Sequence, residues 1–196
     1  GQFMYNELLF HDGDTGQAIL PILRPGSCHS SRWFEHFLEK IVDKIRERFP
    51  NMRIIIRADA GFSRPKFYNL ARDKNLKFCI GIARNEKLQA FTEIFEEYIE
   101  HFYVKKKEKK QVFIGPFQYQ AKTWDKPEKC YAKIESTGKG LNVRYFCSNM
   151  NIEAGALYRD FYVLRGEASE NRIKELKNMC FSDRLSCHKY FANFFR

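Results

Sequence analysis

An uninterrupted run of three isoleucines, Ile54-Ile55-Ile56, limits the fold of this chain more than any other stretch of its sequence. Strands that are buried on both faces of a sheet have continuous apolar runs of this kind, whereas strands with one face in water alternate apolar and polar residues. Burial on both faces requires other elements packed above and below the sheet. The run therefore predicts a buried strand over residues 53–57 in an α/β fold.

The segments around this strand can be assigned from their apolar periodicity and their turn residues. The expected order is strand, strand, helix, strand, helix, strand, over residues 3–10, 17–24, 32–48, 53–57, 65–74 and 78–82. The first two strands are joined by an Asp- and Gly-rich segment, which is typical of a hairpin turn. This order implies a mixed sheet flanked by helices.

The pattern changes after residue 85. A helix near residues 87–100 precedes three strand-like stretches, and a second helix begins near residue 153; the stretches cover residues 112–120, 130–135 and 143–148. We interpret the three stretches as a small antiparallel sheet inserted into the α/β core. The chain is therefore divided into a first part of the core (1–98), a β-rich insertion (99–150) and a C-terminal helical region of the core (151–196).

The chain is strongly basic, with 34 Lys and Arg against 24 Asp and Glu and a formal net charge of +10. This excess favours a polyanionic partner, either nucleic acid or another anionic surface. The lysine-rich segment that contains Lys105, Lys106 and Lys107 is either a solvated loop or a contact with a nucleic-acid backbone. Trp124 either stacks on a base or packs within the insertion, and packing is the favoured interpretation.

Cysteine usage and hydropathy bear on the compartment. No apolar run approaches the roughly 20 residues that a membrane-spanning helix needs, so no membrane partner is expected. The cysteines form no CxxC pair and follow no zinc spacing; they are Cys28, Cys79, Cys130, Cys147, Cys180 and Cys187. We interpret them as reduced thiols and expect a cytoplasmic protein.

Asp59 is the most informative single position. It directly follows the apolar strand, and the carboxyl ends of strands are where α/β proteins usually carry their chemistry. The nearby Gly61 would allow the backbone to approach a ligand closely. The alternative is a structural aspartate that caps a turn or a helix.

Glu170 is the second candidate. At 100° per residue, Tyr162, Glu170, Lys174 and Lys177 fall on one side of a helix. The arrangement is either a surface array of ion pairs or a metal-binding carboxylate flanked by phosphate-binding cations.

Several segments resemble the bacterial insertion-sequence transposases of the DDE class. Residues 162–177 (YVLRGEASENRIKELK) are similar to the Tyr-Arg-Glu-Lys signature of that group, and residues 57–62 (RADAGF) look like its strand-end motif with the second catalytic Asp. The segments LRPG (23–26), IARN (82–85) and ENRIKE (170–175) are also similar. The resemblance covers essentially the whole chain, and it implies a ribonuclease H-like core with a β-rich insertion.

The resemblance also implies a chemistry, namely metal-dependent cleavage and transfer of DNA strands. Asp59 and Glu170 would be catalytic and would bind two Mg²⁺ (or Mn²⁺) ions, which prefer carboxylate oxygens. The implied contacts with the DNA backbone are Tyr162, Arg165, Arg172, Lys174 and Lys177, with Lys105, Lys106 and Lys107 added from the basic segment. The implied partners are transposon-end and target DNA, bound by a homodimer at the bacterial nucleoid.

The chain departs from the family pattern in two ways. Four residues instead of the usual three separate Arg165 from Glu170. The first catalytic Asp of the family, and the core strand that carries it, find no counterpart, and the early residues Asp12 and Asp14 are weak candidates because they lie in the expected turn. The chain is therefore interpreted as a partial catalytic domain whose own activity stays open. The alternatives are an inactive DNA-binding remnant and a metal-dependent nuclease of the same fold.

Overall fold

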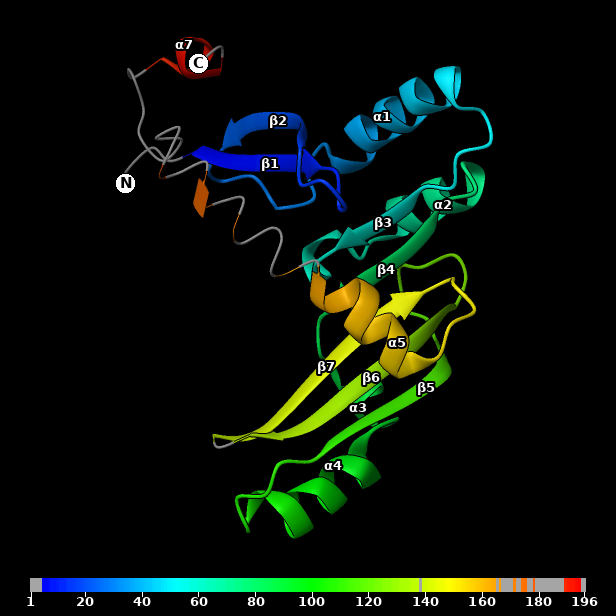
Figure 1. Cartoon of the computed structure of the whole chain (residues 1–196), viewed down its shortest axis with the longest axis vertical. Helices are drawn as coiled ribbons and strands as arrows, with labels where there is room; N and C mark the ends of the chain where they lie inside the picture. Colours follow the sequence, from blue (N-terminus) through cyan, green and yellow to red (C-terminus); the bar gives the residue numbers. More distant parts are fainter. Residues whose placement is uncertain are drawn as a thin grey trace. The chain divides into compact units, whose positions relative to one another are not determined.

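A computed structural model of the chain describes residues 5–137, 139–164, 166, 171, 174–175, 178 and 189–194. The chain forms two compact units (Figure 1). One consists of Glu35–Val163, and the other combines Gly1–Phe34 with Leu164–Arg196. The described strands form two separate sheets, one in each unit.

The two-segment unit contains a β-hairpin. Strand β1 (Tyr5–His11) pairs antiparallel with β2 (Ala18–Pro25), so the predicted hairpin is confirmed. Its turn is closed by Asp12, whose carboxylate accepts hydrogen bonds from the Asp14 and Thr15 amides. The expectation that this hairpin belongs to the central sheet is wrong, because in the described residues β1 and β2 pair with each other and with no other strand.

Arg24 holds the segment that follows the hairpin. Its side chain is almost fully buried, and its guanidinium donates hydrogen bonds to the carbonyl oxygens of Ser30 and Arg32, at 2.6 and 2.9 Å. In the same unit the Tyr190 hydroxyl, on α7 (Tyr190–Phe194), donates to the Leu23 carbonyl at 2.6 Å. Arg24, in one of the family-like segments, therefore has a structural role.

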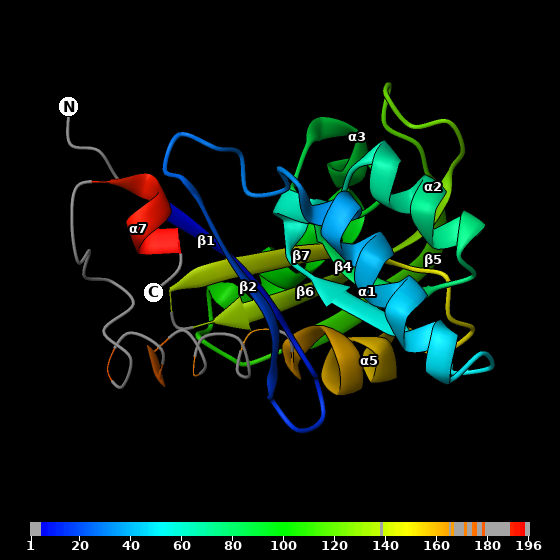
Figure 2. The same cartoon turned by 90° about the horizontal axis from the view of Figure 1, so that it is seen from above.

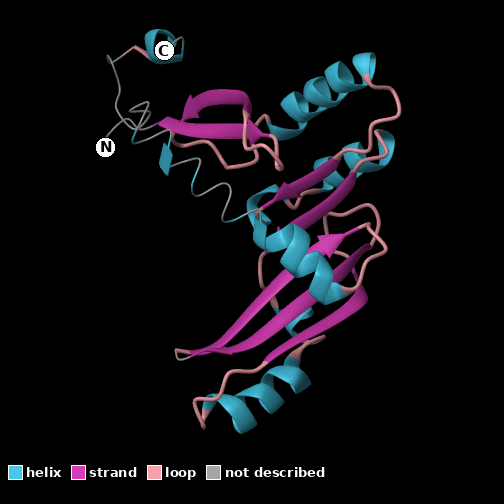
Figure 3. Ribbon diagram, viewed as in Figure 1, coloured by secondary structure: helices cyan, strands magenta, loops and turns pink. Residues whose placement is uncertain are grey.

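The larger unit is built on a mixed sheet (Figure 3). Its described strands lie in the order β3-β4-β7-β6-β5. They are β3 (Ile55–Ala58), β4 (Lys77–Ile82), β5 (Gln111–Tyr119), β6 (Glu128–Thr137) and β7 (Gly140–Ser148). The pair β3-β4 is parallel, and the other pairs are antiparallel. The predicted mixed α/β architecture is therefore confirmed.

Two details of the prediction need correction. The three strands assigned to an insertion are antiparallel as expected, but they continue the core sheet, because β7 pairs with β4 from Cys79 to Ile82. The strand β3 is not buried on both faces: Ile54, Ile55 and Ile56 are each half-buried, because β4 is the one strand that pairs with β3 in the described residues. The division of the chain at residues 98 and 150 stays a prediction.

Helices cover both faces of this sheet (Figure 2). On one face α2 packs through Phe67 and Tyr68 against Phe78 of β4. On the other face the α5–η3 helix packs against Cys79 and Phe146. The helical segments of this region are α1 (Phe34–Arg48), η1 (Ala60–Phe62), α2 (Pro65–Asp73), α3 (Glu86–Gln89), α4 (Glu93–Ile99), η2 (Glu100–Val104), α5 (Ala154–Leu157) and η3 (Tyr158–Tyr162). Within the described ranges, no helix has both the length and the apolar character that crossing a bilayer requires.

Trp124 packs inside the larger unit. Its side chain is buried, and its ring lies 4.6 Å from that of Tyr68 and 5.3 Å from that of Tyr119, measured between centroids. The favoured interpretation of Trp124 as a packing residue is confirmed.

Candidate active site

Asp59 lies at the carboxyl end of β3, directly after Ala58, and its side chain is exposed. Its Oδ1 atom accepts a hydrogen bond from the Gly61 amide at 2.8 Å and thereby caps η1. In the part of the chain that the structure describes, the second oxygen, Oδ2, accepts no hydrogen bond. The structural role proposed for Asp59 is therefore real, and it leaves one carboxylate oxygen available to a ligand.

Gly81 of β4 lies beside Asp59. Ala58 pairs with Ile80 in parallel register, so the next residues of the two strands, Asp59 and Gly81, are neighbours at the same edge of the sheet. A Cβ atom built on Gly81 would lie 2.9 Å from the hydroxyl of Tyr162 and 3.0 Å from the backbone nitrogen of Ala60. Both separations are shorter than ordinary van der Waals contact. The lack of a side chain at Gly81 therefore allows Tyr162 to reach the residue next to Asp59.

The helix that carries Tyr162 begins at a strong cap. The Glu153 carboxylate accepts hydrogen bonds from the amides of Gly155 and Ala156, at 2.7 and 2.9 Å. These two bonds stabilise the ionised form and hold the pKa of Glu153 below its ordinary value. The cap fixes the start of the helix, and nine residues later the chain reaches Tyr162.

The Tyr162 ring is buried between aromatic neighbours. It stacks on Phe146 with centroids 5.4 Å apart and on Tyr158 with centroids 5.3 Å apart. The side chain is 7% exposed. The sequence-based hypothesis assigned Tyr162 to the DNA backbone, whereas the structure packs its ring in the core. Tyr162 thus packs beside Gly81, the neighbour of Asp59, and its contact with DNA stays a prediction.

Most of the other predicted residues of the signature lie outside the part of the chain that the structure describes. Arg165, Glu170, Arg172 and Lys177 lie outside the described residues, as does the expected approach of Glu170 to Asp59. Lys174 is described and exposed, and it belongs to the two-segment unit.

The remaining predicted residues lie in loops. Lys105, Lys106 and Lys107 are exposed directly after η2, in the larger unit. The Asp12 carboxylate takes part in the hydrogen bonds of its own turn, where it also accepts one from the Thr15 hydroxyl at 2.6 Å. Asp14 is exposed in the same turn. The hydrogen bonds of Asp12 agree with its interpretation as a turn residue.

The donor chemistry of this edge suits a hard divalent cation, because Asp59 offers an exposed carboxylate oxygen. Among the described residues, no group of three or more His, Cys, Asp and Glu side chains is arranged to hold a metal ion. Asp59 is therefore a candidate ligand that needs partners from elsewhere in the chain.

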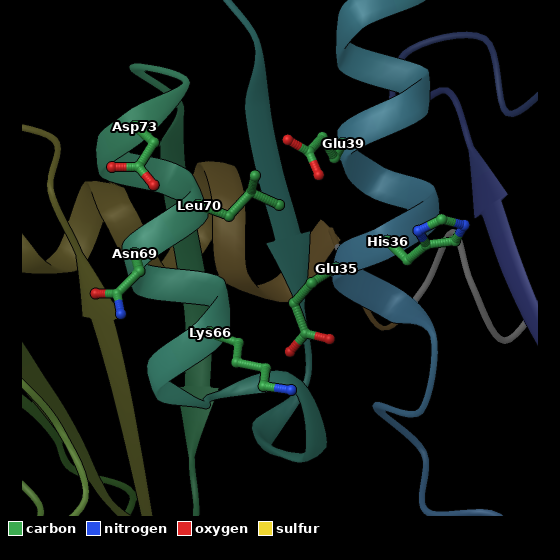
Figure 4. Close-up of a pocket in the computed structure, with 7 residues that line it drawn as sticks. All are labelled: Glu35, His36, Glu39, Lys66, Asn69, Leu70 and Asp73. Carbon is green, nitrogen blue, oxygen red and sulfur yellow. The ribbon is translucent and has the colours of Figure 1, made fainter.

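A groove of about 420 Å³ lies between α1 and α2 (Figure 4). It is lined by Glu35, His36, Glu39, Lys66, Asn69, Leu70 and Asp73. Lys66 extends toward Glu35 across the groove, as Figure 4 shows. Its three carboxylates against one lysine would repel a phosphate backbone. The groove is therefore a poor candidate for binding DNA.

The segment 82–85, which begins at the last residue of β4, is held in the fold by side-chain hydrogen bonds. The Arg84 guanidinium donates to Glu96 at 2.7 Å, and the Asn85 side chain accepts from the Leu88 amide and caps α3. These contacts assign structural roles to two residues of a family-like segment.

The sequence analysis did not single out Gly81, although a glycine inside a strand is a known sign of close backbone approach.

In a comparison with known families, the family described as "Transposase DDE domain group 1" matches residues 1–196. Among curated proteins, no significant match is found.

Proposed function

Because the chain belongs to the family of transposase DDE domains, group 1, we propose that it carries the catalytic residues for cleavage and transfer of DNA strands. The family acts on DNA, which agrees with the net charge of +10. The observation that carries the proposal in the structure is the edge formed by Asp59, Gly81 and Tyr162. It joins the strand-end motif of the family to the first residue of its signature.

The proposal includes a ribonuclease H-like core. The parallel pair β3-β4, the antiparallel strands beside it and the helices on both faces support this assignment. In such α/β sheets, residues that follow the carboxyl ends of strands are well placed for chemistry.

Asp59 and Glu170 are proposed to bind two divalent ions, Mg²⁺ or Mn²⁺. When bound, such ions activate the attacking oxygen and stabilise the leaving oxygen of phosphoryl transfer. The protein's part is to hold the carboxylates still. For Asp59 this is done by the Gly61 amide, which donates a hydrogen bond to Oδ1.

DNA contacts are proposed for the cations Arg165, Arg172, Lys174 and Lys177 and for the exposed segment Lys105, Lys106 and Lys107. Each phosphate contact releases counterions, so the affinity for DNA should fall steeply as salt rises, with a logarithmic slope of about −0.9 per contact. We further propose that the protein acts as a homodimer on DNA in the bacterial cytoplasm.

The test is a plasmid-nicking and strand-transfer assay with Mg²⁺ on the protein and on Asp59→Asn. The amide oxygen of asparagine can still accept the Gly61 hydrogen bond, so this variant should keep its fold and lose cleavage. Asp73→Asn, on the exposed surface of α2, is the matched control and should keep activity.

Each outcome separates the proposal from its alternatives. Nicked and joined products that disappear in Asp59→Asn support a transposase. Nicking without joining would indicate a nuclease of the same fold, and salt-sensitive DNA binding without cleavage would indicate a non-catalytic DNA-binding protein. Cleavage that survives Asp59→Asn would remove Asp59 from the site.

A further inference from the structure

Two cysteines face each other across neighbouring strands of the larger unit. Cys130 of β6 and Cys147 of β7 are register partners in an antiparallel pair, whose strands lie side by side in Figure 1. Both side chains are fully buried, and their sulfur atoms lie 2.6 Å apart. We call these two residues the thiol pair.

The register of the thiol pair satisfies the backbone geometry of a disulfide. Directly opposed residues of an antiparallel pair have Cα atoms about 4.5 or 5.5 Å apart, depending on their place in the ladder. Disulfides join residues whose Cα atoms lie about 4.4–6.8 Å apart. A bond between the two sulfur atoms would therefore need no slip of one strand along the other.

The fold also separates the thiol pair from Cys79. Cys147 is the register partner of Ile80 in β4, and side chains alternate along a strand, so Cys79 lies on the opposite face of the sheet. There Cys79 packs in the cluster around Phe146. Among the described cysteines of the larger unit, Cys130 and Cys147 therefore have each other as the one partner within reach.

The thiol pair is enclosed by α2. The Tyr68 hydroxyl is within hydrogen-bond reach of Cys147, and the Tyr68 side chain is itself buried. Burial raises the pKa of the Cys147 thiol well above its ordinary value, so little of the reactive thiolate is present in the folded unit. Oxidation of the pair should therefore be slow and should depend on local opening of the unit.

We propose that the thiol pair is a site of reversible oxidation, at which hydrogen peroxide converts two thiols to a disulfide. In a reducing compartment, such as the proposed cytoplasm, the pair is held as two thiols. The oxidant is a small molecule because the thiols are buried. The inference does not rest on the proposed catalysis.

The oxidation has two steps. One thiol gives up its proton and its sulfur attacks a peroxide oxygen, which yields a sulfenic acid and one water molecule. The sulfur of the second thiol then attacks the sulfenic sulfur, the S–S bond forms, and the hydroxyl group leaves with the second thiol proton as another water molecule. The two thiols lose two electrons and hydrogen peroxide gains them.

The disulfide would lock β6 to β7. Closing a loop of roughly 15 residues limits the unfolded chain more than the folded one, so the melting temperature of the oxidised protein should rise by roughly 5–10 °C. Oxidation of the thiol pair thus makes the larger unit harder to unfold, and a reductant reverses the change.

Peptide mapping of the full chain identifies the bond. The folded protein is treated with hydrogen peroxide, the peroxide is removed, free thiols are blocked with iodoacetamide in denaturant, and trypsin digestion without reductant is followed by mass spectrometry. Trypsin places the two cysteines in the separate peptides 130–133 and 145–159. We expect these two peptides to be linked, lighter by two hydrogen atoms than their sum, and to separate in dithiothreitol.

Two variants test the assignment. Cys130→Ser should abolish the link and the rise in melting temperature, because it removes one of the two sulfur atoms. Cys79→Ser is the matched control, since Cys79 is a fully buried cysteine of the same sheet, and it should leave both unchanged. Circular dichroism shows that both variants are folded.

The outcomes that would overturn the proposal are read in the unchanged protein, so they do not depend on the folding of a variant. They are a bond from Cys130 or Cys147 to any other cysteine, oxidation of each sulfur to a sulfinic acid without a bond, and no reaction after prolonged exposure to peroxide. Neither measurement requires DNA cleavage, so failure of this inference and failure of the proposed function are separate results.

Discussion

Gly81→Ala tests the packing that links the signature helix to the Asp59 edge. The added methyl group would lie 2.9 Å from the Tyr162 hydroxyl, 3.0 Å from the Ala60 nitrogen and 3.3 Å from the Cε2 atom of the Tyr162 ring. The ring cannot move far, because it stacks on Phe146 and Tyr158. Overpacking of this kind lowers the free energy of unfolding by about 1–3 kcal/mol.

A double-mutant cycle identifies the cause of this loss. Tyr162→Phe removes the atom at 2.9 Å and leaves the two other close contacts in place, so the Gly81→Ala penalty should fall by about 0.5–1 kcal/mol in the Tyr162→Phe background. Urea unfolding followed by circular dichroism measures all four proteins. Gly166→Ala is the control, because a Cβ at Gly166 would meet no atom within 4 Å in the described residues.

Gly81→Ala should also lose function. The backbone nitrogen that the methyl group would displace belongs to Ala60, the residue after Asp59, so Gly81→Ala should reduce DNA cleavage under conditions where the variant is folded. A Gly81→Ala variant as stable as the unchanged protein, or a penalty that is the same with Phe at position 162, would contradict this packing.

Three further predictions concern stability, each measured by urea unfolding. Glu96→Ala should lower the free energy of unfolding by about 2–3 kcal/mol because it removes the acceptor of hydrogen bonds from Thr92, Tyr145 and Arg84, and Tyr145→Phe, which removes one donor, by about 1 kcal/mol; equal stability of the Glu96 variant would contradict this network. Arg72→Ala should lower the free energy of unfolding by about 1–2 kcal/mol at pH 7 and by less at pH 4. Burial raises the pKa of Glu128, and the ion pair with Arg72 opposes this rise. A carboxyl whose pKa is raised in the folded state contributes stability below its ordinary pKa of 4.5, and this contribution is lost as the pH rises. Glu128→Gln should remove this pH dependence. Trp124→Ala should cost about 3–5 kcal/mol and leave DNA affinity unchanged, since the side chain is buried.

Local structure was predictable because its signals are local. The turn at residues 12–15 follows from Asp and Gly, and the helix at residues 65–73 begins at Pro65, whose fixed φ suits a first helical turn. Most of the expected strands and helices lie within a few residues of the observed ones in the described ranges, but the single helix expected near residues 87–100 is divided into α3 and the α4–η2 segment. These features depend on residues that are adjacent in the sequence, so they can be predicted from the sequence alone.

Lateral strand order was not predictable in the same way. An apolar run favours a strand inside a sheet, but it does not show which strand lies beside it, and the burial of its faces depends on those neighbours. The pairing region of β4 and β7 is fully buried, with Cys79, Ile80, Phe146 and Cys147 all at 0% exposure, whereas the isoleucines of β3 are half-buried. Both β4 and β7 also contain three consecutive apolar residues. That shared signal would have placed residues 143–148 in the core sheet.

The candidate site shows why a single aspartate is ambiguous in a sequence. The same Asp59-x-Gly61 pattern produces a turn cap through Oδ1 and leaves Oδ2 exposed, so a structural and a chemical role have one local signature. The structure adds a contact between positions 81 and 162, which brings the helix of Tyr162 to the residue beside Asp59. That contact is possible because Gly81 has no side chain. A glycine within a buried strand is unfavourable for the strand itself, so the presence of Gly81 near the end of β4, beside Asp59, is best explained by the Tyr162 ring that it admits.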